Sequence, residues 1–406
     1  MAIFGMIEQE ILIFWIRGIE LVICRLYAIR TASKFPNPRI HESRFTNNQS
    51  TKMPKPTKPQ VRSGVSQPGS LNPRLQARRP IQRDAEAYVQ GILGGGRILL
   101  SQAITLVEST RAEHQQVARE IVGLCLPHSG RSIRIGITGS PGVGKSTFIE
   151  VLGQHILEQG RRLAVLAIDP SSKMSKGSIL GDKTRMEKLA ASEAAFIRPS
   201  PAGESLGGVA RKTRESIILC EAAGFDTIII ETVGVGQSET AVHSMADFFL
   251  LLLLPGAGDE LQGIKRGIVE MADLIAVNKA DGERLALAKR ARQEYRNALH
   301  LFPPKESGWI PRADICSATT GMGIPEIWRQ IEKYRQKTME NGFFEQNRRV
   351  QAHFWLQEAI DNQLRQAFIR DPDVREKLKG IEQAVIEGKQ SPFQGAEELV
   401  ALFLKK

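Results

Sequence analysis

The sequence is poor in cysteine and contains no closely spaced pair of them. Only four of the 406 residues are cysteines, and no two stand in a Cys-x-x-Cys arrangement. Such pairs supply most of the zinc-binding and redox motifs that a sequence can reveal, so neither kind of site is indicated. Most of the four lie in apolar runs, and we expect reduced, buried thiols in a reducing compartment: Cys24, Cys125, Cys220 and Cys316.

A second absence is that of an apolar run long enough to cross a membrane. A spanning helix needs about 20 mostly apolar residues. Residues 2–29 are rich in Ile, Leu and Phe, but charged residues interrupt them, namely Glu8, Glu10, Arg17, Glu20 and Arg25. Acids inside the stretch also argue against a secretory signal. The sequence therefore predicts no membrane association.

Acidic residues are scarce near the amino terminus, where residues 21–80 contain only Glu42. Residues 1–80 carry thirteen Lys and Arg against four acids, which accounts for most of the net charge of +11. The high charge therefore belongs to a basic tail rather than to a basic groove, which disfavours a nucleic-acid partner.

Residues 31–80 are dense in Pro, Ser, Asn, Lys and Arg, a composition typical of disorder, and we interpret residues 1–83 as a basic extension. One explanation of this extension is a mitochondrial-type transit segment, since such segments are Arg-rich and poor in acids. The protein would then be located in the mitochondrial matrix. The other, which we favour, is that translation begins at Met53 and that the protein is cytoplasmic.

Ordered sequence is predicted from Asp84 onward. Residues 84–130 show helical periodicity broken by Gly94-Gly95-Gly96, which predicts two or three helices. Over residues 131–330, short apolar runs alternate with helical segments, the pattern of a doubly wound, mostly parallel α/β sheet. The predicted strands are 133–138, 163–168, 195–197, 227–231, 248–254, 274–277 and 314–317.

The carboxyl-terminal part of the chain returns to amphipathic helices, and we treat residues 331–406 as a separate helical region. Asp371-Pro372 and Ser391-Pro392 interrupt the pattern, since proline breaks a helix or begins a new one. The predicted helices are 324–342, 345–370, 373–387 and 393–404.

The most specific motif lies between a predicted strand and a predicted helix. Residues 139–147 fit the pattern GxxxxGK[ST]. Its glycines let backbone N–H groups converge on phosphate oxygens, and the helix N-terminus adds its positive end. Lys145 would reach the β- and γ-phosphates, and Ser146 would hold Mg²⁺. The sequence therefore predicts a P-loop NTPase whose phosphate site comprises Gly139, Ser140, Pro141, Gly142, Val143, Gly144, Lys145, Ser146 and Thr147.

A second motif indicates which base the bound nucleotide carries. Asn278-Lys279-Ala280-Asp281 directly follows a predicted strand and matches NKxD. The carboxylate of Asp281 would accept hydrogen bonds from N1–H and the exocyclic amine of guanine, which adenine lacks, so the wrong base should be rejected strongly. Ser317, Ala318 and Thr319 end the next predicted strand and resemble the loop that supports guanine in GTPases. Parallel strands bind ligands at their carboxyl ends, so we predict GTP as the nucleotide.

Acidic residues at other strand ends are candidates for Mg²⁺ and γ-phosphate contacts. Glu231-Thr232-Val233-Gly234 looks like the DxxG element of GTPases with Glu in place of Asp. Asp169 follows a predicted strand, where a turn or cap is its alternative role, and Asp182 lies in a loop rich in Gly, Ser and Lys. We predict metal contacts from Ser146, Asp169, Asp182 and Glu231, and catalytic roles for Lys145, Glu231 and Asp182.

Two further residues are weaker candidates for a role at the nucleotide site. Arg198 could supply positive charge to the transition state, although an arginine in such a position is more often a solvated surface group. His243, on a helix beyond the motifs, is interpreted as a packing residue.

Taken together, the motifs resemble one family. The runs that carry the resemblance are GITGSPGVGKST, DPSS at 169–172, GSILGDKTRM at 177–186, ETVGVGQSE at 231–239, PGAGDELQGIK at 255–265 and NKADG at 278–282. They resemble the MeaB/ArgK-type GTPases associated with methylmalonyl-CoA mutase, over about residues 84–340 and the helical tail. The wider group is named for a glutamate in its third nucleotide motif, which fits Glu231.

The resemblance implies more than the motifs themselves. Such proteins are homodimeric GTPases that use Mg²⁺ and act as chaperones for adenosylcobalamin-dependent acyl-CoA mutases. They gate cofactor loading and protect the mutase from inactivation. Their carboxyl-terminal helices form a dimerisation arm, which here corresponds to residues 331–406. The sequence does not identify which mutase is the partner.

Two other classes of function remain as alternatives. One is a kinase that passes the γ-phosphate to a protein or an amino acid, although nothing in the sequence resembles an acceptor pocket. The other is an ATP-driven partition or targeting ATPase on the same fold, against which the guanine motif argues.

Overall fold

The structure is a computed structural model that describes residues 84–168, 186–199, 206–232, 238–256 and 266–404. The predicted extension of residues 1–83, with the candidate start at Met53, lies outside the described residues.

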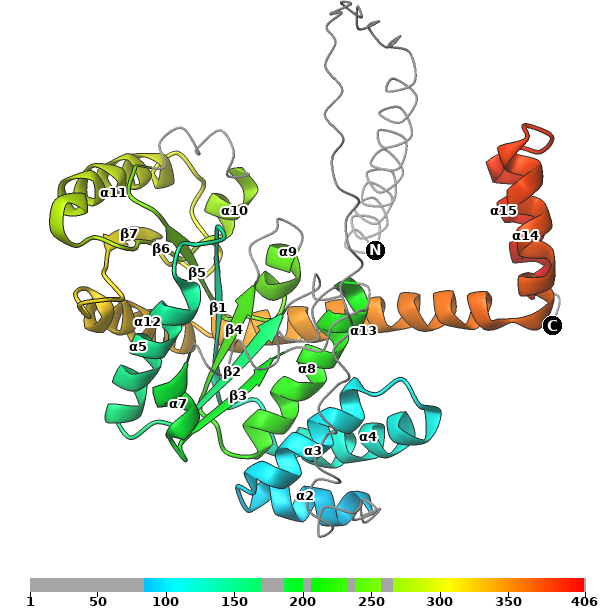
Figure 1. Ribbon diagram of the computed structural model, residues 1–406, viewed down its shortest axis with the longest axis horizontal. Helices are drawn as coiled ribbons and strands as arrows, with labels where there is room; N and C mark the ends of the chain where they lie inside the picture. Colours follow the sequence, from blue (N-terminus) through cyan, green and yellow to red (C-terminus); the bar gives the residue numbers. More distant parts are fainter. Residues whose placement is uncertain (1–83, 169–185, 200–205, 233–237, 257–265, 405–406) are drawn as a thin grey trace, which may run out of the picture. The chain divides into compact units, whose positions relative to one another are not determined.

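Seven strands in the described part of the chain form one parallel sheet, in the order β3-β2-β4-β1-β5-β6-β7 (Figure 1). They are β1 (Ile133–Gly139), β2 (Leu163–Ile168), β3 (Ala195–Pro199), β4 (Thr227–Thr232), β5 (Phe248–Leu253), β6 (Leu274–Val277) and β7 (Arg312–Ile315). The central strands are buried on both faces, as parallel strands covered by helices must be. The predicted α/β fold is therefore confirmed.

One strand lies two residues earlier than the sequence pattern predicts. The predicted strand 314–317 includes Ser317, whose backbone N–H instead donates to the carbonyl of Met322. The chain has therefore already turned into a loop after Ile315, and the polar residues that follow the strand lie at the edge of the sheet.

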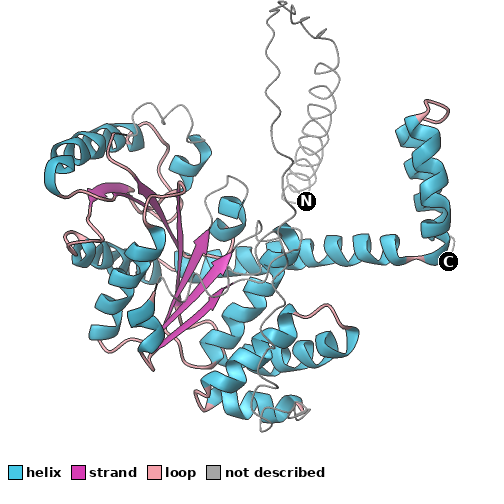
Figure 2. Cartoon of the chain, in the orientation of Figure 1, coloured by secondary structure: helices cyan, strands magenta, loops and turns pink. Residues whose placement is uncertain are grey.

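Helices cover both faces of the sheet (Figure 2). On one face, α5 (Lys145–Glu158), α7 (Glu187–Ala191) and α12 (Ile324–Glu340) bury a core that includes Phe148 and Trp328. The other face carries α8 (Leu206–Ala222), α9 (Ser238–His243), α10 (Arg266–Met271) and α11 (Leu285–Leu299). This two-sided cover is the doubly wound arrangement that the alternating pattern predicts.

Three amino-terminal helices pack against α8. They are α2 (Ala85–Leu93), α3 (Arg97–Glu108) and α4 (Ala112–Cys125). Asp84 caps α2 by accepting a hydrogen bond from the N–H of Ala87 at 2.9 Å. Gly95 has a φ of 77° in the predicted break between α2 and α3, a conformation that glycine adopts readily. Arg198 pairs with Glu108 of α3, so it joins β3 to these helices.

The carboxyl-terminal helices are α13 (Phe343–Arg370), α14 (Pro372–Ile386) and α15 (Pro392–Leu404). Asp371 ends α13 and caps α14, because its carboxylate accepts from the N–H groups of Asp373 and Val374. The helices α14 and α15 pack on each other as a hairpin. None of the helices that the structure describes is both long and apolar enough to cross a membrane.

A buried ionic network holds the first half of α13 against the sheet. Arg134 of β1 donates to Glu221 of α8 at 2.9 and 3.0 Å. Arg348 of α13 donates to both carboxylate oxygens of Asp247 at 2.5 and 2.6 Å and to the carbonyl of Ser132 at 2.9 Å. Burial raises the pKa of Glu221, but the nearby guanidinium groups outweigh it, and the pKa lies below its ordinary value.

Replacing Arg348 by methionine should therefore destabilise the protein more than an ordinary surface change. Arg348→Met leaves the buried carboxylate of Asp247 without its guanidinium partner, and removing one member of a buried ion pair costs about 3–5 kcal/mol. We expect this loss in the free energy of unfolding measured with guanidinium chloride. Arg349→Met, at the exposed neighbouring position, is the control, and equal stability of the two variants would contradict the assigned role.

Candidate nucleotide-binding site

The predicted phosphate loop connects β1 to α5. Gly142 and Gly144 have φ values of 81° and 94°, in the left-handed region that favours glycine. A Cβ atom on Gly144 would also lie 3.1 Å from the side-chain nitrogen of Asn278. The loop therefore needs glycine here both for its turn and for the close approach of a neighbouring loop.

Lys145 is buried at the start of α5. Its ammonium group donates to the carbonyl of Gly139 at 2.8 Å and to that of Ser140 at 3.3 Å, which holds it over the loop. Burial lowers the pKa of Lys145, and the carboxylates of Glu231 and Glu239 oppose that lowering. The loop thus combines a fixed positive charge with a helix N-terminus, the arrangement that binds phosphate.

Ser146 lies beside Glu231 at the carboxyl end of β4. The Ser146 hydroxyl donates to the Glu231 carboxylate at 3.2 Å, because β1 and β4 are neighbours with Ile137 paired to Glu231. Mg²⁺ prefers oxygen ligands and is commonly held by one or two carboxylates together with substrate phosphates. The oxygens of Ser146 and Glu231 fit that donor set.

The other two predicted metal contacts, Asp169 and Asp182, lie outside the described residues, as does Gly234. Within the described ranges, no cluster of three or more His, Cys, Asp and Glu side chains could hold a metal ion. Ser146 and Glu231 are the predicted metal contacts that the described ranges contain.

The guanine motif follows β6, with Asp281 close to the loop that follows β7. The hydroxyl of Ser317 donates to the Asp281 carboxylate at 2.5 Å and accepts from the N–H of Thr320 at 3.2 Å. The carboxylate is thus oriented by a buried serine whose own position is fixed by the backbone. Ala318 is buried beside it and Thr319 is exposed.

Asn278 and Lys279 have roles that the motif alone does not reveal. The Asn278 amide nitrogen donates to the carbonyl of Val143 at 2.9 Å, and its oxygen accepts from the N–H of Ala318 at 3.1 Å. The Lys279 ammonium donates to the carbonyl of Gly142 at 2.8 Å. These side chains join the phosphate loop to the base loops, a contact that no spacing in the sequence encodes.

The predicted site residues that the structure describes meet at one edge of the sheet. They lie in or directly after the carboxyl ends of parallel strands, namely the phosphate loop, Glu231, the NKxD run and residues 317–319. The guanidinium of Arg198 forms an ion pair with Glu108 of α3. His243 lies near the opposite edge, where its ring packs edge-on against Phe249 with centroids 5.4 Å apart.

Comparison with known proteins shows which family the chain belongs to. The family model of the methylmalonyl-CoA mutase-associated GTPase MeaB matches residues 100–373. A Caulobacter vibrioides protein described as a GTPase is 50% identical over 79% of this chain and 98% of its own. GTPase ArgK of Escherichia coli is 44% identical over 75% of this chain and 92% of its own.

Two further relatives extend the comparison. The mouse protein named methylmalonic aciduria type A homolog, mitochondrial, is 43% identical over 79% of this chain and 80% of its own. A solved structure named LAO/AO transport system kinase is 36% identical, with a TM-score of 0.63 over 79% of this chain and 98% of its own. The phosphate loop, the guanine motif and these matches together show that the chain belongs to the MeaB family of methylmalonyl-CoA mutase-associated GTPases.

Proposed function

We propose that this GTPase requires Mg²⁺ and acts as a nucleotide-dependent chaperone of an adenosylcobalamin-dependent acyl-CoA mutase, such as methylmalonyl-CoA mutase. The observation that carries the proposal is the convergence of Lys145, the Ser146–Glu231 pair and Asp281 at one sheet edge. The association that names the family supports the choice of partner. We place the protein in the compartment of that mutase, the cytoplasm.

Hydrolysis at this site would be attack of water on the γ-phosphate. Such reactions are catalysed mainly by positioning and by charge stabilisation rather than by covalent chemistry. Lys145 would neutralise charge on the β- and γ-phosphates, and bound Mg²⁺ would supply further positive charge at the same oxygens. Glu231 would hold the metal, directly or through water, or orient the attacking water.

The nucleotide state could reach the rest of the molecule through α9. This helix begins directly after residues 233–237, which carry the γ-phosphate motif, and it packs on β1, β4 and α8. At its far end, the carbonyl of Ser244 accepts from the Trp355 indole at 3.0 Å, and that of Ala246 accepts from Gln351 at 2.7 Å. Both donors belong to α13. We therefore propose that α13 is the element that responds to hydrolysis.

The same helix is the proposed centre of a homodimer. Large apolar side chains on α13 are exposed in the single chain, namely Val350, Phe354, Leu356, Ile360, Leu364 and Ile369. Exposed apolar surface of this extent is typical of a protein–protein interface. A second copy of the chain is the partner that the family resemblance implies.

Asp281→Asn should remove the preference for GTP over ATP. Asparagine presents an amine where guanine requires an acceptor, and an unmatched buried polar group is strongly rejected. We expect the GTP-over-ATP affinity ratio to fall by about 100-fold or more, while xanthosine triphosphate, which has a carbonyl at that position, gains affinity. Isothermal titration calorimetry measures all three. Glu283→Gln, two residues away and exposed, is the control, and unchanged selectivity in Asp281→Asn would refute the base assignment.

Glu231→Gln should separate binding from hydrolysis. The glutamine keeps the size of the side chain and can still contact Ser146, but it loses the charge that holds Mg²⁺ or orients water. We expect GTP affinity within a few-fold of the original and a turnover about 100-fold lower in a phosphate-release assay. Glu158→Gln, exposed at the other end of α5, should turn over normally. If Glu231→Gln and Glu158→Gln hydrolyse GTP at the same rate, the proposed catalytic role of Glu231 is wrong.

The cognate mutase should accelerate GTP hydrolysis. The side chains that donate hydrogen bonds to the phosphate loop in the described part of the chain are Lys145, Asn278 and Lys279. We therefore propose that a partner completes the charge stabilisation or orders the loops. We expect γ-labelled GTP to release its label only as free phosphate, and faster when purified mutase is added. If added mutase leaves the turnover unchanged, the proposed partnership with the mutase is contradicted. Transfer of the label to a protein or an amino acid would favour the kinase alternative.

A further inference from the structure

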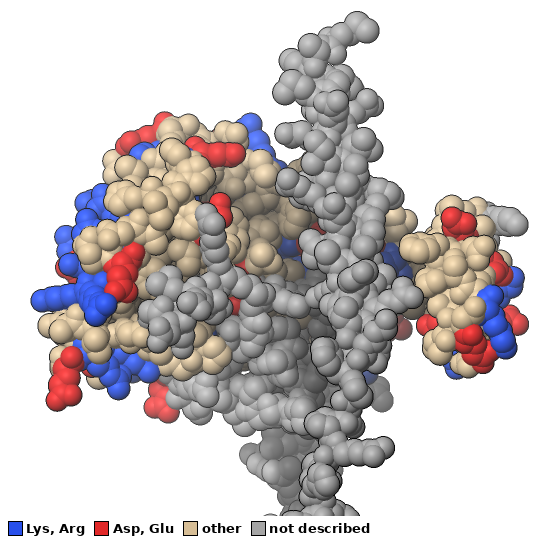
Figure 3. All heavy atoms as spheres, turned by 90° about the horizontal axis from the view of Figure 1, so that it is seen from above, with Lys and Arg blue, Asp and Glu red and all other residues tan. Residues whose placement is uncertain are grey.

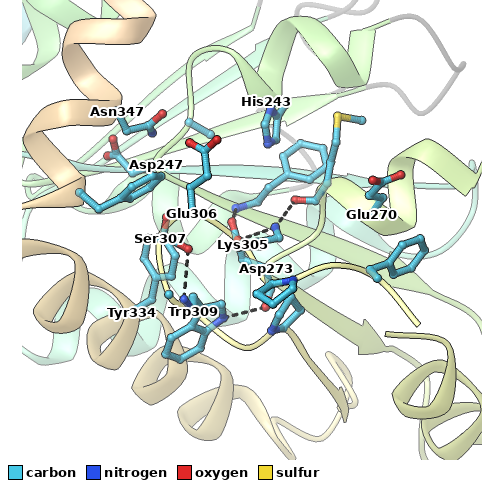
Figure 4. Close-up of a pocket in the computed structure, with 18 of the residues that line it drawn as sticks. His243, Asp247, Glu270, Asp273, Lys305, Glu306, Ser307, Trp309, Tyr334 and Asn347 are labelled. Atoms are coloured by element: carbon cyan, nitrogen blue, oxygen red, sulfur yellow. Dashed lines mark hydrogen bonds and ion pairs between the residues drawn. The ribbon is translucent and has the colours of Figure 1, made fainter. Parts of the chain in front are cut away.

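A cavity of about 830 Å³ opens at the edge of the sheet opposite the nucleotide loops. It lies where β5, β6 and β7 begin, since Asp247, Asp273 and Pro311 immediately precede these strands and line it. Figure 4 shows side chains from several elements around the same space. The volume is in the range of sites that bind small molecules, about 300–1,000 Å³. The mechanism proposed above does not use this cavity.

The wall of the cavity is mainly apolar and aromatic. Phe249 of β5, Met271 at the end of α10 and Trp309 before β7 contribute large side chains. The position of Trp309 is fixed, because its indole N–H donates to the carbonyl of Asp273 at 3.0 Å and its ring packs edge-on against Tyr334 with centroids 5.5 Å apart. A preformed apolar wall with a few polar groups is the usual construction of a small-molecule site.

A polar group on this wall lacks a partner in the described part of the chain. Tyr334 of α12 is 3% exposed and lines the cavity, and its hydroxyl forms no hydrogen bond with a described residue. The hydroxyl is not among the unpartnered side-chain atoms that protein encloses completely, so its accessible surface faces the cavity. Burial raises the pKa of Tyr334, and Asp273 and Asp247 raise it further, so the hydroxyl keeps its proton. A buried hydroxyl without a partner costs free energy, which a hydrogen bond to a ligand would recover.

The charges around the cavity are mostly negative. The described residues that line it include four carboxylates and one ammonium group. Asp247 and Asp273 are each held in an ion pair. Glu270 and Glu306 are exposed and form no ion pair with another described residue. Two carboxylates at the cavity are therefore available to a ligand.

This surplus of negative charge is local to the cavity. The whole chain carries a net charge of +11, and Lys and Arg lie beside Asp and Glu over the part of the surface that Figure 3 draws in colour. Partial desolvation lowers the pKa of His243, which also lines the cavity; Asp273 opposes this lowering and Lys305 adds to it. The His243 ring is therefore neutral at pH 7 and does not offset the two carboxylates.

These groups indicate the chemistry of a ligand. An ammonium group on an apolar body would lie among aromatic rings, which attract cations, and near carboxylates of opposite charge, whereas an anion would meet like charge. We propose that the cavity binds a small organic cation, with its positive charge toward Glu270 and Glu306 and its apolar body against Phe249 and Trp309. The Tyr334 hydroxyl then supplies a hydrogen bond inside the cavity.

The inference does not depend on the homodimer proposed above. Val350 and Phe354 of the exposed apolar face of α13 also line the cavity. The groups that define its chemistry belong to other elements, because Glu270 lies on α10, Glu306 lies in the loop before β7 and Tyr334 lies on α12.

A ligand in this cavity would also contact both elements of the path proposed above for the nucleotide signal. His243 ends α9, whereas Asn347 and Gln351 belong to α13, and all three line the cavity. If α13 responds to hydrolysis, these two parts of the wall move relative to each other, and a ligand between them binds one arrangement better than the other. The bound cation therefore changes the affinity for GTP, and GTP changes the affinity for the cation by the same factor. This effector role rests on the proposed response of α13.

Three probes of similar size test the charge preference on the full chain, namely phenethylamine, its neutral analogue 2-phenylethanol and the anion phenylacetate. In ligand-observed NMR titrations we expect the amine to bind about tenfold more tightly than the alcohol, and the anion to show no saturable binding. Equal binding of all three probes, or no binding of the amine, would overturn the inference. If the apparent affinity for the amine falls as the protein concentration rises, a second copy of the chain occupies the cavity instead and the inference is also wrong.

Substitutions at the wall test where the amine binds. The double variant Glu270→Gln with Glu306→Gln should bind the amine and the alcohol alike, while Glu120→Gln, exposed on α4, should keep the preference. An unchanged preference in the double variant would contradict the site.

Tyr334→Phe removes only the hydroxyl from the wall. It should weaken the binding of both probes about threefold without lowering the Tm, because the hydroxyl has no protein partner to lose. A lower Tm would give the hydroxyl a structural role, and unchanged probe binding would exclude it from the site; either result contradicts the assignment.

The effector role is tested by titrating GTP with and without saturating phenethylamine. We expect the dissociation constant of GTP to change about fivefold or more, and the double glutamine variant to lose this effect. If the amine binds but leaves the dissociation constant unchanged, the effector role is wrong. Hydrolysis of GTP without the probe is a separate measurement of the function proposed above, so the failure of one is distinguishable from the failure of the other.

Discussion

One amide side chain, that of Asn278, fixes the distance between the two halves of the nucleotide site. It donates to the phosphate loop and accepts from the loop after β7, although β5 separates β1 from β6 in the sheet. Because it is buried, the loss of either partner would leave a polar atom without compensation, at a cost of about 1–3 kcal/mol. The loops that carry Asp281 and Lys145 are therefore held as one unit. Gly144 leaves room for this amide, since a side chain at position 144 would press against the Asn278 nitrogen.

The two edges of the sheet are connected through β1 itself. Arg134, the second residue of the strand, pairs with Glu221 of α8 and lies 5.5 Å from the centroid of the Trp355 ring of α13. The strand ends in the phosphate loop. The guanidinium of Arg214 of α8 lies 5.4 Å from the centroid of the same ring. Trp355 thus contacts two arginines, and its indole N–H donates to the carbonyl of Ser244, which follows α9. A movement of α9 would therefore have to break one of these contacts or displace the Trp355 indole of α13.

Much of the fold and of the site could be predicted from the sequence, because both depend on local patterns. The apolar runs of the parallel strands, the glycine break after α2 and the prolines that begin α14 and α15 are each encoded within a few residues. The contacts that join distant segments could not be predicted. Arg198 finds Glu108 across 90 residues, and Arg348 finds Asp247 across 101. Nothing in the sequence around either arginine specifies its partner. The sequence therefore left Arg198 as a solvated surface group or a candidate catalytic charge, and it gave no indication of a role for Arg348.

The glutamate at position 231 shows how strand register sets the chemistry. Glu231 pairs with Ile137 of β1, so its backbone stands two residues before the phosphate loop begins. From there its carboxylate reaches the Ser146 hydroxyl at 3.2 Å. An aspartate would be shorter by one carbon–carbon bond of about 1.5 Å, too short for a direct hydrogen bond from the same backbone position. A protein with aspartate here would need a different strand register or a bridging water. The longer acid is therefore what lets this strand end contact Ser146 directly.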